Sequence, residues 1–257
     1  MTNAIDWGHA VVSKDQWLEA RKTLLLKEKE FTRQRDELSR QRRELPWEKV
    51  EKSYVFSGPN GEETLAELFD GRSQLIVYHF MLGPGWAEGC KSCSFLADHF
   101  DATVVHLAQR DVTLVVASRA PLSEIEAFKK RMGWRFKWVS SYGGDFNFDY
   151  QASFAKEARV DGKAYYNYGL TEFPSEEVPG LSVFYKEPQS NDVFHTYSAY
   201  ARGLDILVGV YNFLDHAPKG RDEDSLPFTM EWVRHHDRYE EHPKAAAGCC
   251  HAEEIHA

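Results

Sequence analysis

The sequence has 257 residues, of which 42% are hydrophobic, and a formal charge of −9 with a pI of about 5.7. This length favours one large domain, or one domain with extensions, and the apolar content is sufficient for a core. The acidic balance argues against a nucleic-acid partner, because such a surface needs a basic field.

The chain is expected to be soluble and cytoplasmic, without a membrane partner. No apolar run approaches the ~20 residues of a membrane span. Residues 1–16 lack the basic start and the apolar stretch of a secretory signal. Four cysteines are too few for a disulfide framework in a chain of this length, so they indicate metal binding or catalysis.

A long helix is predicted between Ser13 and Leu45. Ser13 and Gln16 fit a capping box, and Pro46 is a suitable stop. Apolar residues recur at every seventh position: Trp17, Leu24, Phe31, Leu38 and Leu45. The second heptad position is mostly polar, whereas a coiled coil needs both positions apolar. We therefore expect this helix to pack along its own domain or a partner subunit, with a homodimeric coiled coil as the alternative.

Strands and helices alternate from residue 54 onward. Continuous apolar runs predict buried strands, and helical spacing predicts the segments between them. The expected order is strand 54–56, strand 74–82, helix 94–109, strand 112–117, helix 121–132 and strand 136–139. Such alternation predicts a parallel sheet with right-handed crossovers. Open α/β sheets place their sites at the carboxyl edge of the strands.

The second half of the chain is predicted to hold two hairpins. Alternating aromatic residues at Phe146, Phe148 and Tyr150, with Asp161-Gly162 further on, indicate an inserted β-hairpin. Residues 181–187 and 192–200 form a strand–turn–strand pattern, and an apolar helix follows at 204–214.

Three regions are therefore expected. Residues 1–46 form an N-terminal helical extension, residues 47–217 an α/β domain, and residues 218–257 a polar C-terminal extension. The last ~15 residues are predicted to be a disordered tail. This tail contains Cys249 and Cys250.

Two cysteines follow the first long strand, in the stretch "GPGWAEGCKSCSF". Cys90 falls at a predicted helix start, where free N–H groups and the helix dipole favour an anion and lower a thiol pKa. Cys93 lies one turn further on the same face, at a separation that suits a disulfide. A CxxC pair in a βαβ context is typical of a redox motif. We expect Cys90 to be the exposed attacking sulfur and Cys93 the buried resolving one.

A zinc site is the first alternative for this pair, and it needs two more ligands. The other cysteines are adjacent near the end of the chain, and His99 and His106 point away by helical phase. No metal is therefore expected. The second alternative is a structural pair that is merely packed under a loop.

Most of the chain, up to about Tyr239, resembles a family of uncharacterised bacterial thioredoxin-like proteins that are described as predicted dithiol-disulfide oxidoreductases. The resemblance is carried by "RSQLIVYHFMLGPGWAEGCKSCSF", "RDVTLVVASRAPLSEIEAFKKRMGWRFKWVSS", "DFNFDY" and "GLSVFYKE". It implies a thioredoxin-like three-layer α/β/α fold and a redox role without established substrates.

The resemblance also implies a proline opposite the active cysteine. Pro179 matches that position, and a cis bond there would hold a backbone edge against Cys90 for a substrate disulfide; an ordinary trans proline is the alternative. Thioredoxins carry a tryptophan just before the first cysteine, whereas here Gly89 takes that place and Trp86 is displaced. Peroxidases of the peroxiredoxin type carry a proline, and a threonine or serine, at fixed positions before the cysteine. This chain has Gly83 and Ala87 at those positions, which disfavours peroxide reduction.

Two further residues are candidates for supporting roles. Arg119 leaves the second strand at the same edge as Cys90, where a cation would stabilise the thiolate or guide an anionic substrate; a plain surface arginine is the alternative. His79 lies near the end of the first strand and either relays protons to Cys93 or is a core histidine.

The expected function is thiol–disulfide oxidoreduction on a protein or small-molecule substrate, with no bound cofactor. The alternatives are a thiol peroxidase that uses Cys90 and a non-enzymatic interaction protein in which the thiols are incidental.

Overall fold

The computed structural model describes residues 8–155, 161–173 and 175–240. The chain divides into two units, Met1–Trp47 and Glu48–Ala257. Within the described ranges, no helix combines the length and the apolar character that crossing a membrane requires.

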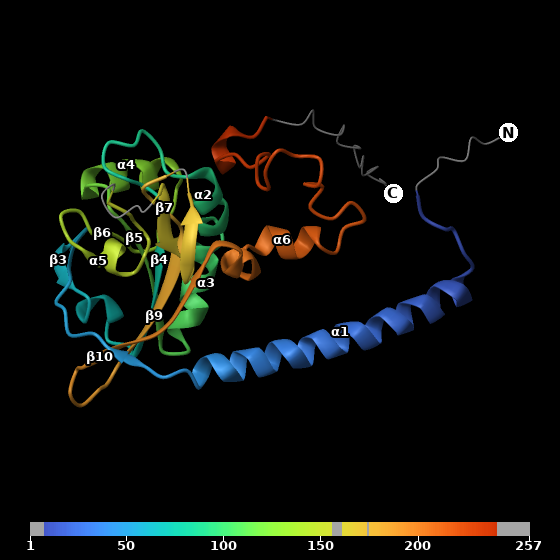
Figure 1. The fold of residues 1–257 in the computed structure, drawn as a ribbon, viewed down its shortest axis with the longest axis horizontal. Coiled ribbons are helices and arrows are strands. Elements are labelled where there is room, and N and C mark those ends of the chain that lie inside the picture. Colours follow the sequence, from blue (N-terminus) through green and yellow to red (C-terminus); the bar gives the residue numbers. More distant parts are fainter. Residues whose placement is uncertain (1–7, 156–160, 174, 241–257) are drawn as a thin grey trace, which may run out of the picture. The chain divides into compact units, whose positions relative to one another are not determined.

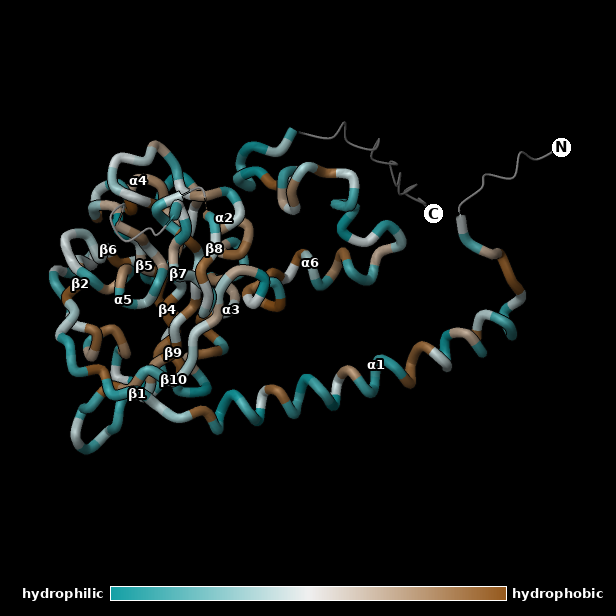
Figure 2. The backbone as a smooth tube through the Cα atoms, viewed as in Figure 1, coloured by the Kyte–Doolittle hydropathy of each residue, from teal (hydrophilic) through white to brown (hydrophobic). Residues whose placement is uncertain are grey.

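The first unit contains the long helix α1 (Lys14–Arg43). The predicted capping box is confirmed: the N–H of Gln16 donates to Ser13 Oγ at 3.3 Å, and the N–H of Ser13 donates to Gln16 Oε1 at 3.1 Å. No residue of α1 is buried, and Figure 2 shows separate hydrophobic bands along it. The expectation that this apolar stripe meets its own domain or a partner subunit stays a prediction.

The second unit is built on an eight-stranded sheet in the order β1-β10-β9-β4-β5-β6-β2-β3. The strands are β1 (Glu48–Lys49), β2 (Val55–Gly58), β3 (Gly61–Thr64), β4 (Gln74–His79), β5 (Val112–Ser118), β6 (Trp138–Ser140), β9 (Gly180–Lys186) and β10 (Val193–Tyr200). Strands β4, β5 and β6 are parallel, whereas β9 runs antiparallel to both β4 and β10. A parallel core extended by an antiparallel hairpin is the thioredoxin-like arrangement, so the expected fold class is confirmed.

Helices α2 (Lys91–Ala97), α3 (Phe100–Ala108) and α4 (Leu122–Arg131) pack on one face of the sheet. Figure 1 shows α2 and α3 beside the central strands. The single helix predicted for 94–109 is divided at Asp98, whose carboxylate accepts a hydrogen bond from the Trp134 indole at 2.8 Å. The opposite face is covered by the short helices η1 (Glu67–Phe69) and α5 (Phe146–Asp149).

An inserted hairpin is present, but it lies further along the chain than the aromatic alternation indicates. It consists of β7 (Lys163–Tyr166) and β8 (Gly169–Glu172). Residues 146–149 are instead the helix α5. Phe146 and Tyr150 are four residues apart, so a helical turn brings them together, and their rings lie 4.7 Å apart.

The C-terminal segment returns to the sheet unit. The predicted closing helix is present as η3 (Ala201–Leu207) followed by α6 (Gly209–Leu214). Further on, Val233 is fully buried in the same core as Cys93, and His235, the N-cap of η4 (His236–Arg238), is 6% exposed. Residues 218–240 therefore pack with the sheet unit, and the boundary drawn at 217 is too early. Cys249 and Cys250 lie outside the described residues.

Leu75→Ala tests whether the packing on one face of the sheet can be weakened without changing the dithiol on the other face. Leu75 is fully buried on the face that carries η1 and α5. Because a cavity would remain, the free energy of unfolding should fall by about 2–5 kcal/mol in urea denaturation. The pKa of Cys90, which lies beyond the other face, should not change. A shifted thiol titration would contradict this separation.

Candidate functional site

The loop between β4 and α2 fixes the position of Cys90. The N–H of Cys90 donates to the carbonyl of Met81 at 3.0 Å, and Cys90 is the N-cap of α2. A side chain at Gly89 would place its Cβ 2.6 Å from Phe80 and 2.7 Å from Phe128. Gly89 is therefore required by this close approach. A tryptophan at this position, as in thioredoxins, would not fit.

The two thiols differ sharply in environment. Both are free; Cys90 is half-buried, and Cys93 is 2% exposed. The Cys93 thiol donates a hydrogen bond to Cys90 and lowers the pKa of Cys90 to about 6, against the opposing effect of burial. The N–H groups of Cys93 and Ser92 and the Ser92 hydroxyl add to this lowering. Burial raises the pKa of Cys93 well above its ordinary value. Near neutral pH the pair is thus a thiolate at Cys90 and a thiol at Cys93.

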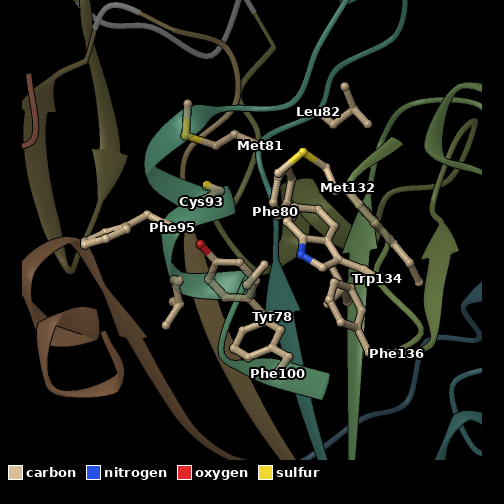
Figure 3. Packing of buried hydrophobic residues seen from close by; sticks show 14 of the residues in the cluster. Tyr78, Phe80, Met81, Leu82, Cys93, Phe95, Phe100, Met132, Trp134 and Phe136 are labelled. Atoms are coloured by element: carbon tan, nitrogen blue, oxygen red, sulfur yellow. The ribbon is translucent and has the colours of Figure 1, made fainter. Parts of the chain in front are cut away.

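Tyr78 is a site residue that the sequence analysis missed. It is 1% exposed on β4, and its hydroxyl donates a hydrogen bond to the sulfur of Cys93. Figure 3 shows the Tyr78 oxygen directed toward Cys93 on α2. Burial raises the pKa of Tyr78, followed by the effect of Cys93, so the phenol keeps its proton. The signal in the sequence was the one hydroxyl group in a buried strand, next to the polar His79.

The two residues between the cysteines, Lys91 and Ser92, make different contacts. Ser92 directs its N–H and hydroxyl to Cys90. Lys91 Nζ donates to the carbonyl of Glu231 at 3.0 Å and lies 5.7 Å from the centre of the Phe228 ring. This spacer therefore supports the thiolate and also ties the C-terminal segment to the start of α2.

A pocket of about 220 Å³ holds both cysteines. Pro179 lines it, as expected for a proline near the dithiol. The peptide bond before Pro179 is trans, because the described residues contain no cis peptide bond, so the expected cis proline is wrong. Hydrogen bonds from the residues on both sides of this peptide bond hold the loop around Pro179. The N–H of Val178 donates to Ala152 O at 2.9 Å, and Tyr166 Oη donates to Pro179 O at 2.7 Å.

Arg119 is engaged by Glu177 and does not line the dithiol pocket. Its Nε donates to Glu177 Oε1 at 2.7 Å, and the Glu177 side chain is 2% exposed. The Ser153 hydroxyl donates to the other carboxylate oxygen at 2.6 Å. The guanidinium also lies 4.7 Å from the centre of the Phe148 ring. Arg119 therefore neutralises a buried carboxylate two residues before Pro179, which replaces the expected role at the thiolate.

His79 is the core histidine of the two alternatives. It is fully buried, its ring stacks on Phe146 at 5.4 Å, and Nε2 lies 2.9 Å from Ser182 Oγ. Burial lowers its pKa to about 3. Successive residues of a strand point to opposite faces, so Tyr78 faces Cys93 and His79 faces away. Of the two alternatives for His79, the structure therefore supports the core histidine and not the proton relay to Cys93.

Trp86 closes the turn ahead of the dithiol. The backbone N–H of Trp86 donates to Gly83 O at 3.1 Å, and the partly buried indole ring packs against the core that contains Cys93. A Cβ at Gly83 would lie 2.9 Å from the indole nitrogen. Trp86 thus shapes the loop and does not line the dithiol pocket.

In the parts of the chain that the structure describes, no group of three or more His, Cys, Asp and Glu side chains could hold a metal ion.

The chain belongs to DUF899, a family of bacterial proteins of unknown function, whose model matches residues 7–239. No curated protein matches it. Among solved structures, peroxidoxin BcpB from Mycobacterium tuberculosis is 12% identical, with a TM-score of 0.43 over 64% of this chain and 94% of that one. A PrxQ mutant from Xylella fastidiosa is 12% identical, with a TM-score of 0.39 over 62% and 89%. A putative protein disulfide isomerase from Bacteroides thetaiotaomicron is 16% identical, with a TM-score of 0.37 over 65% and 91%.

The alkylation rate of Cys90 by iodoacetamide should rise with pH to a plateau, with a midpoint at about pH 6. An ordinary thiol would give a midpoint near 8.5. Cys93→Ala removes the strongest donor to the sulfur and should move the midpoint toward this ordinary value.

Ser92→Ala should move the midpoint of Cys90 alkylation in the same direction by a smaller amount. Ser94→Ala is the matched control, because the Ser94 hydroxyl donates to the carbonyl of Cys90 at 2.9 Å and not to its sulfur. A midpoint of Cys90 alkylation above pH 8 in the wild type would contradict the lowering of the Cys90 pKa by Cys93 and Ser92.

Proposed function

We propose that this member of the DUF899 family is a thiol–disulfide oxidoreductase in which Cys90 attacks and Cys93 resolves. The observation that carries the proposal is the asymmetry of the two sulfurs. Cys90 is the more accessible one, with a pKa lowered to about 6, and Cys93 behind it retains its proton. Attack by a thiolate and resolution by a neighbouring thiol need this division of roles.

The reaction conserves atoms and electrons over two exchanges. The Cys90 thiolate attacks one sulfur of a substrate disulfide, forms a mixed disulfide and releases the first substrate thiolate. That thiolate takes up the proton of Cys93. The Cys93 thiolate then attacks Cys90 Sγ, closes the Cys90–Cys93 disulfide and releases the second substrate thiolate. The substrate is reduced, the protein dithiol is oxidised, and a thiol reductant is needed to restore it.

Tyr78 supports the second exchange. Cys93 is buried, so its thiolate is costly to form without a hydrogen-bond donor. The Tyr78 hydroxyl donates to this sulfur. Its role is to stabilise the Cys93 thiolate during resolution, while the first attack at Cys90 does not require it.

Cys93→Ser should separate the proposed function from its alternatives. Dipyridyl disulfide releases one coloured pyridinethione at each exchange. Cys249 and Cys250 are two further thiols, so this and the later disulfide assays use the full chain with both replaced by serine. In that background the reduced protein should release two equivalents and form the Cys90–Cys93 disulfide. Adding Cys93→Ser should reduce the release to one equivalent and retain the mixed disulfide at Cys90, seen by mass spectrometry.

The alternatives are separated by rate and by a second oxidant. A thiol peroxidase would consume hydrogen peroxide and accumulate Cys90 sulfenic acid in Cys93→Ser. In an interaction protein with incidental thiols, Cys90 would release pyridinethione only at the rate and with the pH dependence of an ordinary thiol, and peroxide would not be consumed.

Tyr78→Phe should slow only the second release of pyridinethione. A hydrogen bond to a charged group contributes about 1.5–3 kcal/mol, so resolution should slow about tenfold or more while the first release changes less than about twofold. Phenylalanine keeps the packing of the ring.

Tyr211→Phe is the matched control for Tyr78→Phe. Tyr211 is a buried tyrosine of the same core, but its hydroxyl donates to Glu223 at 2.8 Å. Equal rates of resolution in wild type and Tyr78→Phe would show that Tyr78 has only a packing role.

A further inference from the structure

The pocket in front of the dithiol has walls that come from five parts of the chain. Tyr78 and Met81 come from β4 and the residues after it, and Leu96 comes from α2. The other walls are the segment that contains Phe173 and Pro179, η3 with the residue after it, and the C-terminal segment. The lining residues are Tyr78, Met81, Cys90, Ser92, Cys93, Leu96, Phe173, Pro179, Ala201, Leu204, Asp205, Val208 and Met230. Most of these side chains are apolar, so the pocket favours an apolar group beside the Cys90 sulfur.

Apart from the Cys90 thiolate, Asp205 is the one charged residue in this lining, and its charge is compensated. Its carboxylate lies 3.2 Å from Arg202 Nε and 3.1 Å from Arg221 Nη1. It therefore does not offer an unpaired charge to a ligand.

A larger cavity of about 960 Å³ adjoins the pocket and shares Phe173, Pro179, Ala201, Asp205 and Met230 with it. Its remaining lining is mainly polar and includes charged residues of 219–224. Pockets for drug-sized ligands measure roughly 300–1,000 Å³, and the inner pocket is smaller than this. The inner space therefore accepts one apolar arm, while the rest of a ligand extends into the polar cavity.

The backbone beside the dithiol is already paired within the chain. The N–H of Val178 donates to Ala152 O at 2.9 Å, and the N–H of Phe154 donates to Glu176 O at 2.8 Å. Ser153 and Glu177 form the β-bridge between these two segments. An extended polypeptide binds by adding a strand to free backbone groups. The edge that such a substrate would use before Pro179 is occupied by residues 152–154.

We propose that the dithiol pocket binds the apolar arm of a low-molecular-weight disulfide and that folded proteins are not its substrates. This inference rests on the proposed function, and the exchange at Cys90 follows the two steps given there. The apolar arm lies against Met81, Leu204 and Met230, with its sulfur at Cys90.

The first experiment compares three disulfides on the reduced full-length protein. These are the apolar dipyridyl disulfide, the polar hydroxyethyl disulfide, and insulin as a protein disulfide. The rate at which the protein reduces each disulfide is divided by the rate at which dithiothreitol reduces the same disulfide. This division cancels the intrinsic reactivity of the compound. The normalised rate should be at least tenfold higher for dipyridyl disulfide than for hydroxyethyl disulfide, and lowest for insulin. Equal normalised rates, or a preference for insulin, would overturn the inference while the proposed function stands.

The second experiment changes the pocket wall. Met230→Glu places a charge in the inner pocket, whereas Phe213→Glu, the matched control, places it at an exposed position of α6 that lines neither cavity. Met230→Glu should lower the rate with dipyridyl disulfide at least tenfold and the rate with hydroxyethyl disulfide less than twofold. Phe213→Glu should leave both rates within twofold. Equal losses with both disulfides in Met230→Glu would contradict an apolar subsite.

A third measurement does not depend on redox chemistry. Diphenyl sulfide has two apolar arms and no disulfide bond to cleave, so calorimetry reports binding alone. We expect saturable binding to the wild type, with at least tenfold weaker binding to Met230→Glu. Absence of binding to the wild type would overturn the apolar subsite even if Met230→Glu failed to fold. Binding without reduction of any disulfide would instead refute the proposed function and keep the subsite.

Discussion

The hydrogen bond from the Cys93 thiol to the Cys90 sulfur is the contact on which the site depends. It makes two chemically identical side chains unequal: one is held as a thiolate with a pKa of about 6, and the other is held as a thiol by burial. The contact exists because Cys90 caps α2 and Cys93 lies one turn further on. The loop before α2 keeps this geometry, since Gly89 packs against Phe80 and Phe128 where no side chain fits.

The C-terminal segment secures the same loop from outside the sheet. His235 Nε2 donates to the carbonyl of Gly89 at 2.8 Å, and Lys91 holds Glu231 from the start of α2. Arg131 adds charged contacts to Glu88 and Asp237 at 2.9 and 2.8 Å. Polar residues of the C-terminal segment thus hold the dithiol loop in place. The same segment contributes Met230 to the pocket wall. One segment therefore both stabilises the loop and lines the pocket that we propose for the substrate.

The local signals in the sequence predicted the parts of the fold that depend on short stretches. The apolar runs at 74–82 and 112–117 are long enough to identify buried strands, and the CxxC spacing places both sulfurs at one helix start. The apolar run at 74–82 does not show which side chains point to which face of the sheet, because a strand that is buried on both faces lacks the alternation of polar and apolar residues. For this reason the sequence left two roles open for His79 and assigned none to its neighbour Tyr78, which is the residue that faces Cys93.

The other errors have a similar origin in contacts that sequence spacing does not encode. Phe146, Phe148 and Tyr150 fit a strand at every second residue, but Phe146 and Tyr150 equally fit a helical turn. The role of Arg119 depends on Glu177, which is 58 residues away. The packing of residues 218–240 depends on the few apolar side chains in a polar stretch, including Val233.

The most direct test of a reversible dithiol is its redox equilibrium with glutathione. The protein is equilibrated over graded ratios of reduced to oxidised glutathione, and mass spectrometry quantifies the peptide that contains the Cys90–Cys93 disulfide. We expect one reversible two-electron transition, with the same midpoint from the reduced and the oxidised side. A peptide that remains as two free thiols, or that carries only glutathione adducts at every ratio, would contradict it.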